Sequence, residues 1–277
     1  MLHRQFHQDR GHSSVHPGVS FLRNAELIPF GTPDELAAAV AAAWLDEVVA
    51  ATRANQRHCV ALSGGRITLK LFAAVIEQSK ARNLSLTGVD FFWADERCVP
   101  PNDAESSFAA ADKFFFQLLA IAAGRIHRIR GEESPEVAAR EAEAEICRIA
   151  SLNADGQPVL DLIFLGVGED GHVASLFPGE PEAAMTDQSV YRVVRNSPKP
   201  PPVRITLGYA AIAAAQRVWV LASGAGKEAA LRESLKPDGP TPLARVLRSR
   251  PATKVFTDIR QFTFRFSACV RNWRQVS

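Results

Sequence analysis

Short, almost purely apolar runs alternate along this chain with longer segments in which apolar residues recur at helical spacing, and this alternation constrains the fold most. Apolar runs of this length are typical of strands that are buried on both faces of a parallel sheet. We therefore expect an α/β protein with a mostly parallel sheet and helices on both faces. The expected strands are residues 58–62, 89–93, 159–165, 218–222 and 254–256.

The segments between these runs carry helical patterns. Residues 34–53 form an alanine-rich amphipathic segment, with Thr32 placed to cap the helix and Pro33 at its first position. Further helices are expected at residues 67–81, 106–123 and 135–152. The proline-rich run at residues 197–202 is expected to be a stiff extended connector.

The length of 277 residues fits one large domain with tails. Residues 1–24 are polar without a hydrophobic period, which predicts a flexible leader, and no role is assigned to a C-terminal extension at residues 261–277. A single α/β domain is expected at residues 25–260.

The net charge of +2 and the absence of a long apolar run argue against nucleic acid and membrane partners. Four scattered cysteines without a CxxC pair favour a reducing, cytoplasmic location and no structural metal.

A glycine-rich segment, GVGEDG at residues 166–171, follows the most apolar expected strand. A dinucleotide fingerprint would need a helix opening at the third glycine and an acid about 20 residues further on. Pro178 interrupts such a helix, and Tyr191 stands at the acid's position. We instead expect a tight turn that presents Asp170 and His172 at the rim of the sheet, where the histidine can accept a proton from water. The alternative is a histidine that caps a backbone carbonyl.

Five segments occur in an order that resembles the motifs of the 6-phosphogluconolactonase family, which is related to glucosamine-6-phosphate isomerases and deaminases. They are ALSGG at residues 61–65, FFWADERCVP at 91–100, DLIFLGVGEDGHVASLFPG at 161–179, RITL at 204–207 and GAGK at 224–227. The resemblance spans about residues 25–260. It implies a Rossmann-like fold related to sugar-phosphate isomerases and deaminases, no cofactor and no metal, and a catalytic domain. The implied reaction is hydrolysis of 6-phospho-D-glucono-1,5-lactone to 6-phosphogluconate in the oxidative pentose phosphate pathway.

The resemblance implies a general base at His172, and Asp170 could orient its ring or merely cap the turn. Lys227 begins a helix after Gly226, an unfavourable place for a cation unless an anion binds there. Arg97 could clamp an anion or form a surface salt bridge, and Glu96 could be structural, pairing with an arginine. The expected substrate-binding residues are Ser63, Gly64, Gly65, Arg66, Asp95, Glu96, Arg97, Gly168, Gly171, Arg204 and Lys227.

Two departures from the family pattern concern residues that are expected to contact the substrate. After its glycine pair the family usually has two hydroxyl residues and a proline, and this chain has Arg66-Ile67-Thr68 there. The family also usually has a serine-asparagine pair further on, where this chain has Ser106-Ser107. Two alternatives stay open: an amino-sugar-phosphate deaminase or isomerase, although residues 174–178 lack the acid it should need, and a non-catalytic sugar-phosphate-binding protein. The expected partner is a small sugar phosphate, and a monomer or small homo-oligomer is expected.

Overall fold

The structure is a computed structural model that describes residues 25–250 and 253–259. The expected leader at residues 1–24 and the expected extension at residues 261–277 lie outside the described residues. The division of the chain into a leader, one domain and an extension therefore stays a prediction.

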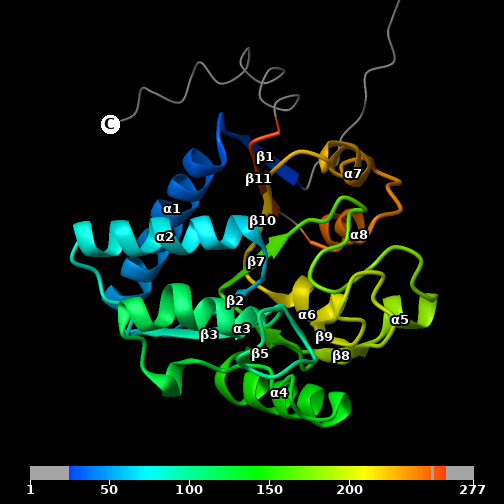
Figure 1. The fold of residues 1–277 in the computed structure, drawn as a ribbon, viewed down its shortest axis with the longest axis horizontal. Coiled ribbons are helices and arrows are strands. Elements are labelled where there is room, and N and C mark those ends of the chain that lie inside the picture. The colour runs from blue at the N-terminus through cyan, green and yellow to red at the C-terminus, as the bar shows by residue number, and fades with distance from the viewer. Residues whose placement is uncertain (1–24, 251–252, 260–277) are drawn as a thin grey trace, which may run out of the picture.

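A six-stranded sheet forms the centre of the molecule, and all five of its strand pairs are parallel (Figure 1). This confirms the expected α/β fold with a parallel sheet. In spatial order the strands are β1 (Ala25–Pro29), β11 (Thr253–Thr257), β10 (Val218–Ala222), β7 (Leu162–Gly166), β2 (His58–Leu62) and β3 (Val89–Trp93). After β2 the chain runs outward to β3 and later returns to the other side of β2 as β7, so the strand order reverses between β2 and β7. Ligands of parallel sheets bind at such a reversal.

Helices lie on both sides of these strands (Figure 1). The helices α1 (Pro33–Arg53) and α2 (Arg66–Ala81) lie on one side, and α6 (Tyr209–Ala214), α7 (Glu228–Ser234) and α8 (Pro242–Arg248) lie on the other. The Thr32 side chain accepts a hydrogen bond from the Glu35 amide, which confirms the expected cap of α1. None of the helices in the described part of the chain is long and apolar enough to cross a membrane.

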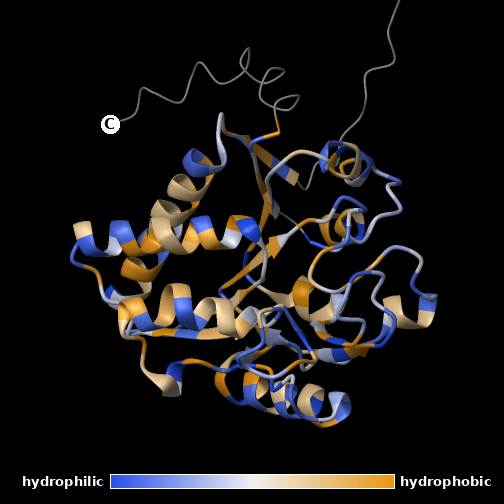
Figure 2. Ribbon diagram, viewed as in Figure 1, coloured by the Kyte–Doolittle hydropathy of each residue, from blue (hydrophilic) through white to orange (hydrophobic). Residues whose placement is uncertain are grey.

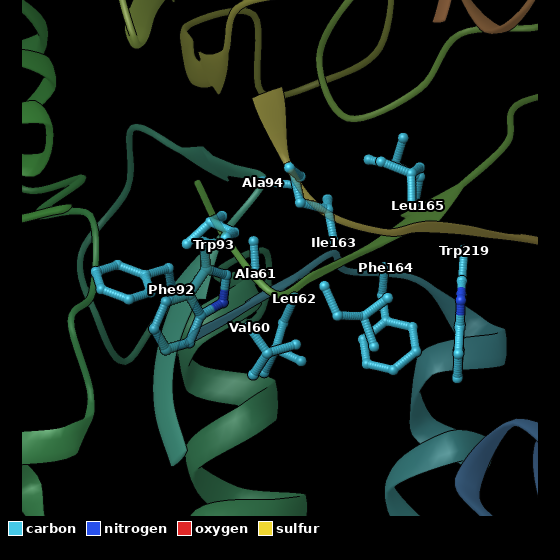
Figure 3. Packing of buried hydrophobic residues seen from close by; sticks show 14 of the residues in the cluster. Val60, Ala61, Leu62, Phe92, Trp93, Ala94, Ile163, Phe164, Leu165 and Trp219 are labelled. Carbon is cyan, nitrogen blue, oxygen red and sulfur yellow. The ribbon is translucent and has the colours of Figure 1, made fainter. Parts of the chain in front are cut away.

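Alternation of side chains along the strands builds a core on both faces of the sheet. Val60 and Phe164 project from one face, and Ala61 and Ile163 from the other (Figure 3). Phe164 meets Trp44 of α1 edge to face, with ring centroids 5.5 Å apart. Hydrophobic colour dominates the central strands, whereas α2 and α4 (Pro135–Ile149) alternate hydrophobic and hydrophilic residues (Figure 2).

The helix expected at residues 106–123 is shorter and irregular. It begins as α3 (Ser107–Ala111), continues as a π-helical turn η1 (Asp112–Phe116) and a 3-10 turn η2 (Gln117–Leu119), and ends where Ala120 adopts a φ of 50°. The wide π turn lets the adjacent residues Phe115 and Phe116 both enter the core, where each is at most 1% exposed. A further 3-10 turn, η3 (Ala123–Arg125), follows.

Two other expected boundaries were also wrong. The helix expected to reach residue 152 ends at Ile149, and β5 (Ser151–Leu152) pairs with β6 (Pro158–Val159). The strand expected at residues 159–165 is broken between β6 and β7, where the Asp161 carboxylate accepts a hydrogen bond of 2.8 Å from the Cys59 amide.

A second, antiparallel sheet was not expected. It contains β4 (Asp95–Arg97), β9 (Arg204–Leu207) and β8 (Tyr191–Val194), in that order, and the short helix α5 (Glu182–Thr186) precedes β8. This sheet is attached to the central one by the Tyr191 hydroxyl, which donates to the carbonyl of Trp93 at 2.7 Å. Residues 197–202 form a closed loop rather than a stiff extended connector, because the Ser197 amide donates to the Pro202 carbonyl at 2.9 Å.

Candidate active site

A cavity of about 650 Å³ opens at the carboxyl ends of β2, β3, β7 and β10, around the point where the strand order reverses. The segments that follow these strands, together with β4, β9 and the N-termini of α2 and α7, supply its walls. The predicted binding residues that line it are Ser63, Gly64, Gly65, Arg66, Asp95, Arg97, Gly168, Arg204 and Lys227, and His172 lines it with them.

The turn that carries His172 is closed by backbone hydrogen bonds. The Gly168 amide donates to the carbonyl of His172 at 2.9 Å, and the Gly171 amide donates to the carbonyl of Gly168 at 3.0 Å. A side chain at position 168 would place its Cβ only 2.0 Å from His172 Nδ1. Gly171 has a φ of 81°, which favours glycine. The two glycines therefore allow the chain to fold back tightly against the histidine ring.

His172 and Asp170 form a pair across this turn. The Nδ1 atom of His172 lies 2.5 Å from Oδ1 of Asp170, which also accepts the His172 amide at 3.2 Å. The ring packs against Phe177, with a centroid distance of 4.8 Å. Nε2 makes no hydrogen bond within the described residues, so it is free to act on a ligand in the cavity.

Burial lowers the pKa of His172, and the hydrogen bond and charge of Asp170 oppose this, while the charge of Lys199 adds to the lowering. Burial alone would raise the pKa of Asp170, but the hydrogen bond and charge of His172 outweigh it and hold that pKa below its ordinary value. At neutral pH the pair is therefore a neutral imidazole and a carboxylate. The carboxylate holds the ring proton on Nδ1, and Nε2 is left as a basic nitrogen.

The side chains of three cations at the cavity make no ion pair or hydrogen bond within the described residues: Arg66, Lys199 and Lys227. Burial lowers the pKa of Lys227, and the nearby charge of Arg66 lowers it further. Gly65, which caps α2 in a conformation with a φ of 118°, offers no side-chain acceptor to the first amides of that helix. Unpaired cations beside uncapped amides fit a ligand that carries a doubly charged anion.

Two other predicted cations have protein partners. Arg97 Nη1 donates to the carbonyl of Glu105, and Arg204 donates to the carbonyls of Lys199, Pro200 and Pro201 at 3.0 Å each. Arg204 is 4% exposed, so most of its guanidinium serves the 197–202 loop. Arg97 and Arg204 therefore contribute positive potential to the cavity while also holding its walls.

Buried polar contacts fix the walls next to His172. The Asp95 carboxylate accepts a hydrogen bond of 2.7 Å from Ser175 Oγ, and Ser63 Oγ donates to the carbonyl of Phe164 at 2.8 Å. A Cβ at Gly64 would lie 2.8 Å from Ser107 Oγ. Within the described residues no group of three or more His, Cys, Asp or Glu side chains is arranged to hold a metal ion.

Comparison with known proteins places this arrangement in a family. A family model described as glucosamine-6-phosphate isomerases/6-phosphogluconolactonase matches residues 31–256. A 6-phosphogluconolactonase of Streptomyces coelicolor is 34% identical over 220 residues, which cover 77% of this chain and 84% of that protein. The chain belongs to the 6-phosphogluconolactonase family. A 6-phosphogluconolactonase of Aggregatibacter actinomycetemcomitans is 32% identical, over 76% of this chain and 89% of its own.

Solved structures agree with this 6-phosphogluconolactonase fold. The 6-phosphogluconolactonase of Trypanosoma brucei superposes with a TM-score of 0.74 at 26% identity, and the match covers 86% of this chain and 96% of that one. A monomeric glucosamine-6-phosphate deaminase shares the fold, with a TM-score of 0.69 at 21% identity over 87% of this chain and 100% of that one.

Two predicted binding residues of this 6-phosphogluconolactonase family member lie outside the cavity. Glu96 is 2% exposed and accepts hydrogen bonds from the amides of Arg97, Ser107 and Phe108 and from Ser106 Oγ, so it caps the start of α3 instead of binding a ligand. This placement fits the alternative of a structural Glu96, although its partners are amides and a hydroxyl rather than an arginine. Gly171 shapes the turn and packs against Thr241.

Lys199 and Glu169 line the cavity but were not among the predicted residues. Lys199 lies within the proline-rich run that was interpreted as a connector. Its closeness in sequence to Arg204, at the start of the RITL motif, is the signal that could have identified it. Glu169 is the neighbour of Asp170, and its charge reaches Lys227.

Proposed function

We propose that this chain hydrolyses 6-phospho-D-glucono-1,5-lactone to 6-phosphogluconate, with His172 as the general base that activates water. The observation that carries the proposal is the Asp170–His172 pair, which leaves a basic Nε2 free in a cavity with three unpaired cations. Membership of the 6-phosphogluconolactonase family supports the same reaction. The reaction would serve the oxidative pentose phosphate pathway, and the cytoplasm is the expected location.

In the proposed reaction, Nε2 of His172 removes a proton from water as the water oxygen attacks the lactone carbonyl carbon. The carbonyl electron pair moves onto its oxygen and forms a tetrahedral oxyanion. When that pair returns, the bond to the ring oxygen breaks, and the protonated His172 gives its proton to the ring oxygen as it leaves. The product is a carboxylic acid with a free hydroxyl group, and the base is regenerated. The acid then releases its remaining proton to solvent water and becomes the carboxylate.

Asp170 serves this cycle in two ways. Its carboxylate holds the ring proton on Nδ1, which leaves Nε2 as the basic nitrogen of a ring that lines the cavity. It also stabilises the imidazolium that forms when Nε2 takes the proton, because a negative charge beside a cation favours the charged form. Asp170 is therefore a positioning and charge-stabilising residue.

The phosphate of the substrate is assigned to Arg66, Lys227 and the first amides of α2. Neither side chain makes an ion pair or a hydrogen bond within the part of the chain that the structure describes, and the pKa of Lys227 is lowered by burial and then by the charge of Arg66. A phosphate dianion would relieve the repulsion between the two side chains. Arg66 stands where the family usually has a hydroxyl residue, so this chain would replace one hydroxyl contact with a charge.

The test is an assay of the purified chain with freshly prepared 6-phosphogluconolactone, with the spontaneous rate subtracted. We expect turnover of this lactone, much weaker turnover of unphosphorylated gluconolactone, and no release of ammonia from glucosamine 6-phosphate. Ammonia release would favour the deaminase alternative. Thermal stabilisation by 6-phosphogluconate without any lactone turnover would favour a non-catalytic sugar-phosphate-binding protein and contradict the proposal.

A further inference from the structure

The loop at residues 197–202 holds the backbone of Lys199 in place while its side chain remains exposed. Ser197 Oγ donates to the carbonyl of Lys199 at 2.8 Å and accepts the Lys199 amide at 3.2 Å. Arg204 Nη2 donates to the carbonyls of Lys199 and Pro200 at 3.0 Å. A lysine on a fixed backbone at the wall of a cavity delivers its charge to a limited region of that cavity.

That region is the side of the cavity where His172 lies. The Arg204 guanidinium, which holds the loop, lies 5.8 Å from the centroid of Phe177, and Phe177 packs against the His172 ring at 4.8 Å. Phe177 therefore contacts both the Arg204 guanidinium, which holds the loop, and the ring of His172. The charge of Lys199 also contributes to the lowered pKa of His172, together with burial and against the opposing charges of Asp170 and Asp95.

The other two unpaired cations come from the starts of two helices, and the charge of Lys199 reaches Lys227 as well as His172. Arg66 is the first residue of α2, and Lys227 directly precedes α7. In the proposed substrate the phosphate on C6 and the carbonyl at C1 stand at opposite ends of the carbon chain. A substrate with its phosphate on Arg66 and Lys227 and its C1 atom at His172 would bring its carbonyl oxygen to Lys199.

We infer that Lys199 is a catalytic residue that donates a hydrogen bond to the lactone carbonyl oxygen and stabilises the oxyanion that water attack creates there. The inference rests on the proposed hydrolysis. Lys199 stays protonated throughout: the proton from water goes to His172 and then to the ring oxygen, and the ammonium supplies only charge and a hydrogen bond. A charge placed before the reaction where negative charge develops lowers the barrier without reorganisation.

The experiment compares Lys199→Met with the wild type on the phosphorylated and the unphosphorylated lactone. Loss of one donor to a developing oxyanion typically lowers kcat about 10²- to 10³-fold, and we expect a fall of this order on both lactones. Lys227→Met should instead raise KM for the phosphorylated lactone far more than KM for the unphosphorylated one. Lys236→Met is the control, because Lys236 pairs with Glu233 outside the cavity.

A second measurement does not depend on turnover. Titration of the His172 imidazole by NMR should show a higher pKa in Lys199→Met than in the wild type, because a neighbouring positive charge has been removed. An unchanged kcat, an unchanged His172 titration, or a loss confined to the phosphorylated lactone would overturn the inference for Lys199. In those cases an active wild-type enzyme would leave the proposed hydrolysis standing. An inactive wild type would overturn both.

Discussion

Asp170 Oδ1 lies 2.5 Å from Nδ1 of His172, and the same oxygen accepts the His172 amide. One carboxylate oxygen thus holds both the backbone and the ring of a residue two positions later. The contact fixes the ring orientation and its tautomer together. Nε2 is left as the atom that can act in the cavity, and the first two predictions depend on this arrangement.

Asp170→Asn should lower kcat by part of the about 10²- to 10⁴-fold that a positioned general base contributes. In the variant the uncharged side-chain amide does not stabilise the imidazolium. In the wild type, Asp170 raises the pKa of His172 against the effect of burial. The acidic limb of the pH–rate profile should therefore move to lower pH in this variant. Steady-state assays across pH test this, and a limb that moves upward would contradict the assigned role of Asp170.

The wild-type pH profile should show a titrating base whose pKa lies below the ordinary value for histidine. Burial lowers the pKa of His172 from 6.5, and Lys199 adds to the effect. A general base acts when it is unprotonated, so kcat/KM should fall toward acidic pH with a midpoint below 6.5. The measurement is kcat/KM between mildly acidic and neutral pH, corrected for spontaneous hydrolysis. A midpoint above 6.5 would contradict a lowered pKa of His172.

Gly168→Ala should damage catalysis more than folding. The added Cβ would lie 2.0 Å from His172 Nδ1 and 2.6 Å from Asp170 Oδ1, so the pair must move apart. Gly124→Ala is the control, because its Cβ meets nothing within 4 Å. We expect a large loss of kcat in Gly168→Ala with a circular dichroism spectrum like that of the wild type, and near-normal activity in the control. Equal activity of the two variants would refute the crowding argument.

Glu96→Gln should destabilise the protein without a specific effect on phosphate recognition. The carboxylate accepts from three amides and the Ser106 hydroxyl, and a glutamine would turn an NH₂ group toward some of these donors. A buried donor without a partner costs about 1–3 kcal/mol, and we expect the free energy of unfolding to fall by this amount. Glu133→Gln, an exposed change, is the control in urea unfolding. A stability equal to that of the control would show that Glu96 is not the cap of α3.

Elements with a strong local signal were predictable from the sequence. The α1 helix has a cap at Thr32 and a long amphipathic pattern, and β2 and β3 are mostly apolar runs with polar residues soon after their ends. The antiparallel sheet was not predictable, because β4 has three residues and pairs with β9 from far along the chain. No local pattern encodes such a pairing.

The residues of the candidate site also differ in how far the sequence could predict them. His172 and Asp170 lie two residues apart in one glycine-rich turn, so their proximity followed from sequence. Glu96 is different: whether it faces the cavity or α3 depends on where α3 packs, and neighbouring motif residues can face opposite ways along a strand. Lys199 reaches the cavity because a distant turn at Phe177 and the buried Arg204 support its loop.

The central claim, that His172 is the general base, is tested most directly by the kcat of His172→Asn on 6-phosphogluconolactone. Spontaneous hydrolysis is subtracted, and circular dichroism confirms folding. The account predicts a fall of about 10²- to 10⁴-fold in kcat, with a much smaller change in the affinity for 6-phosphogluconate. A folded His172→Asn variant with near-wild-type kcat would contradict it.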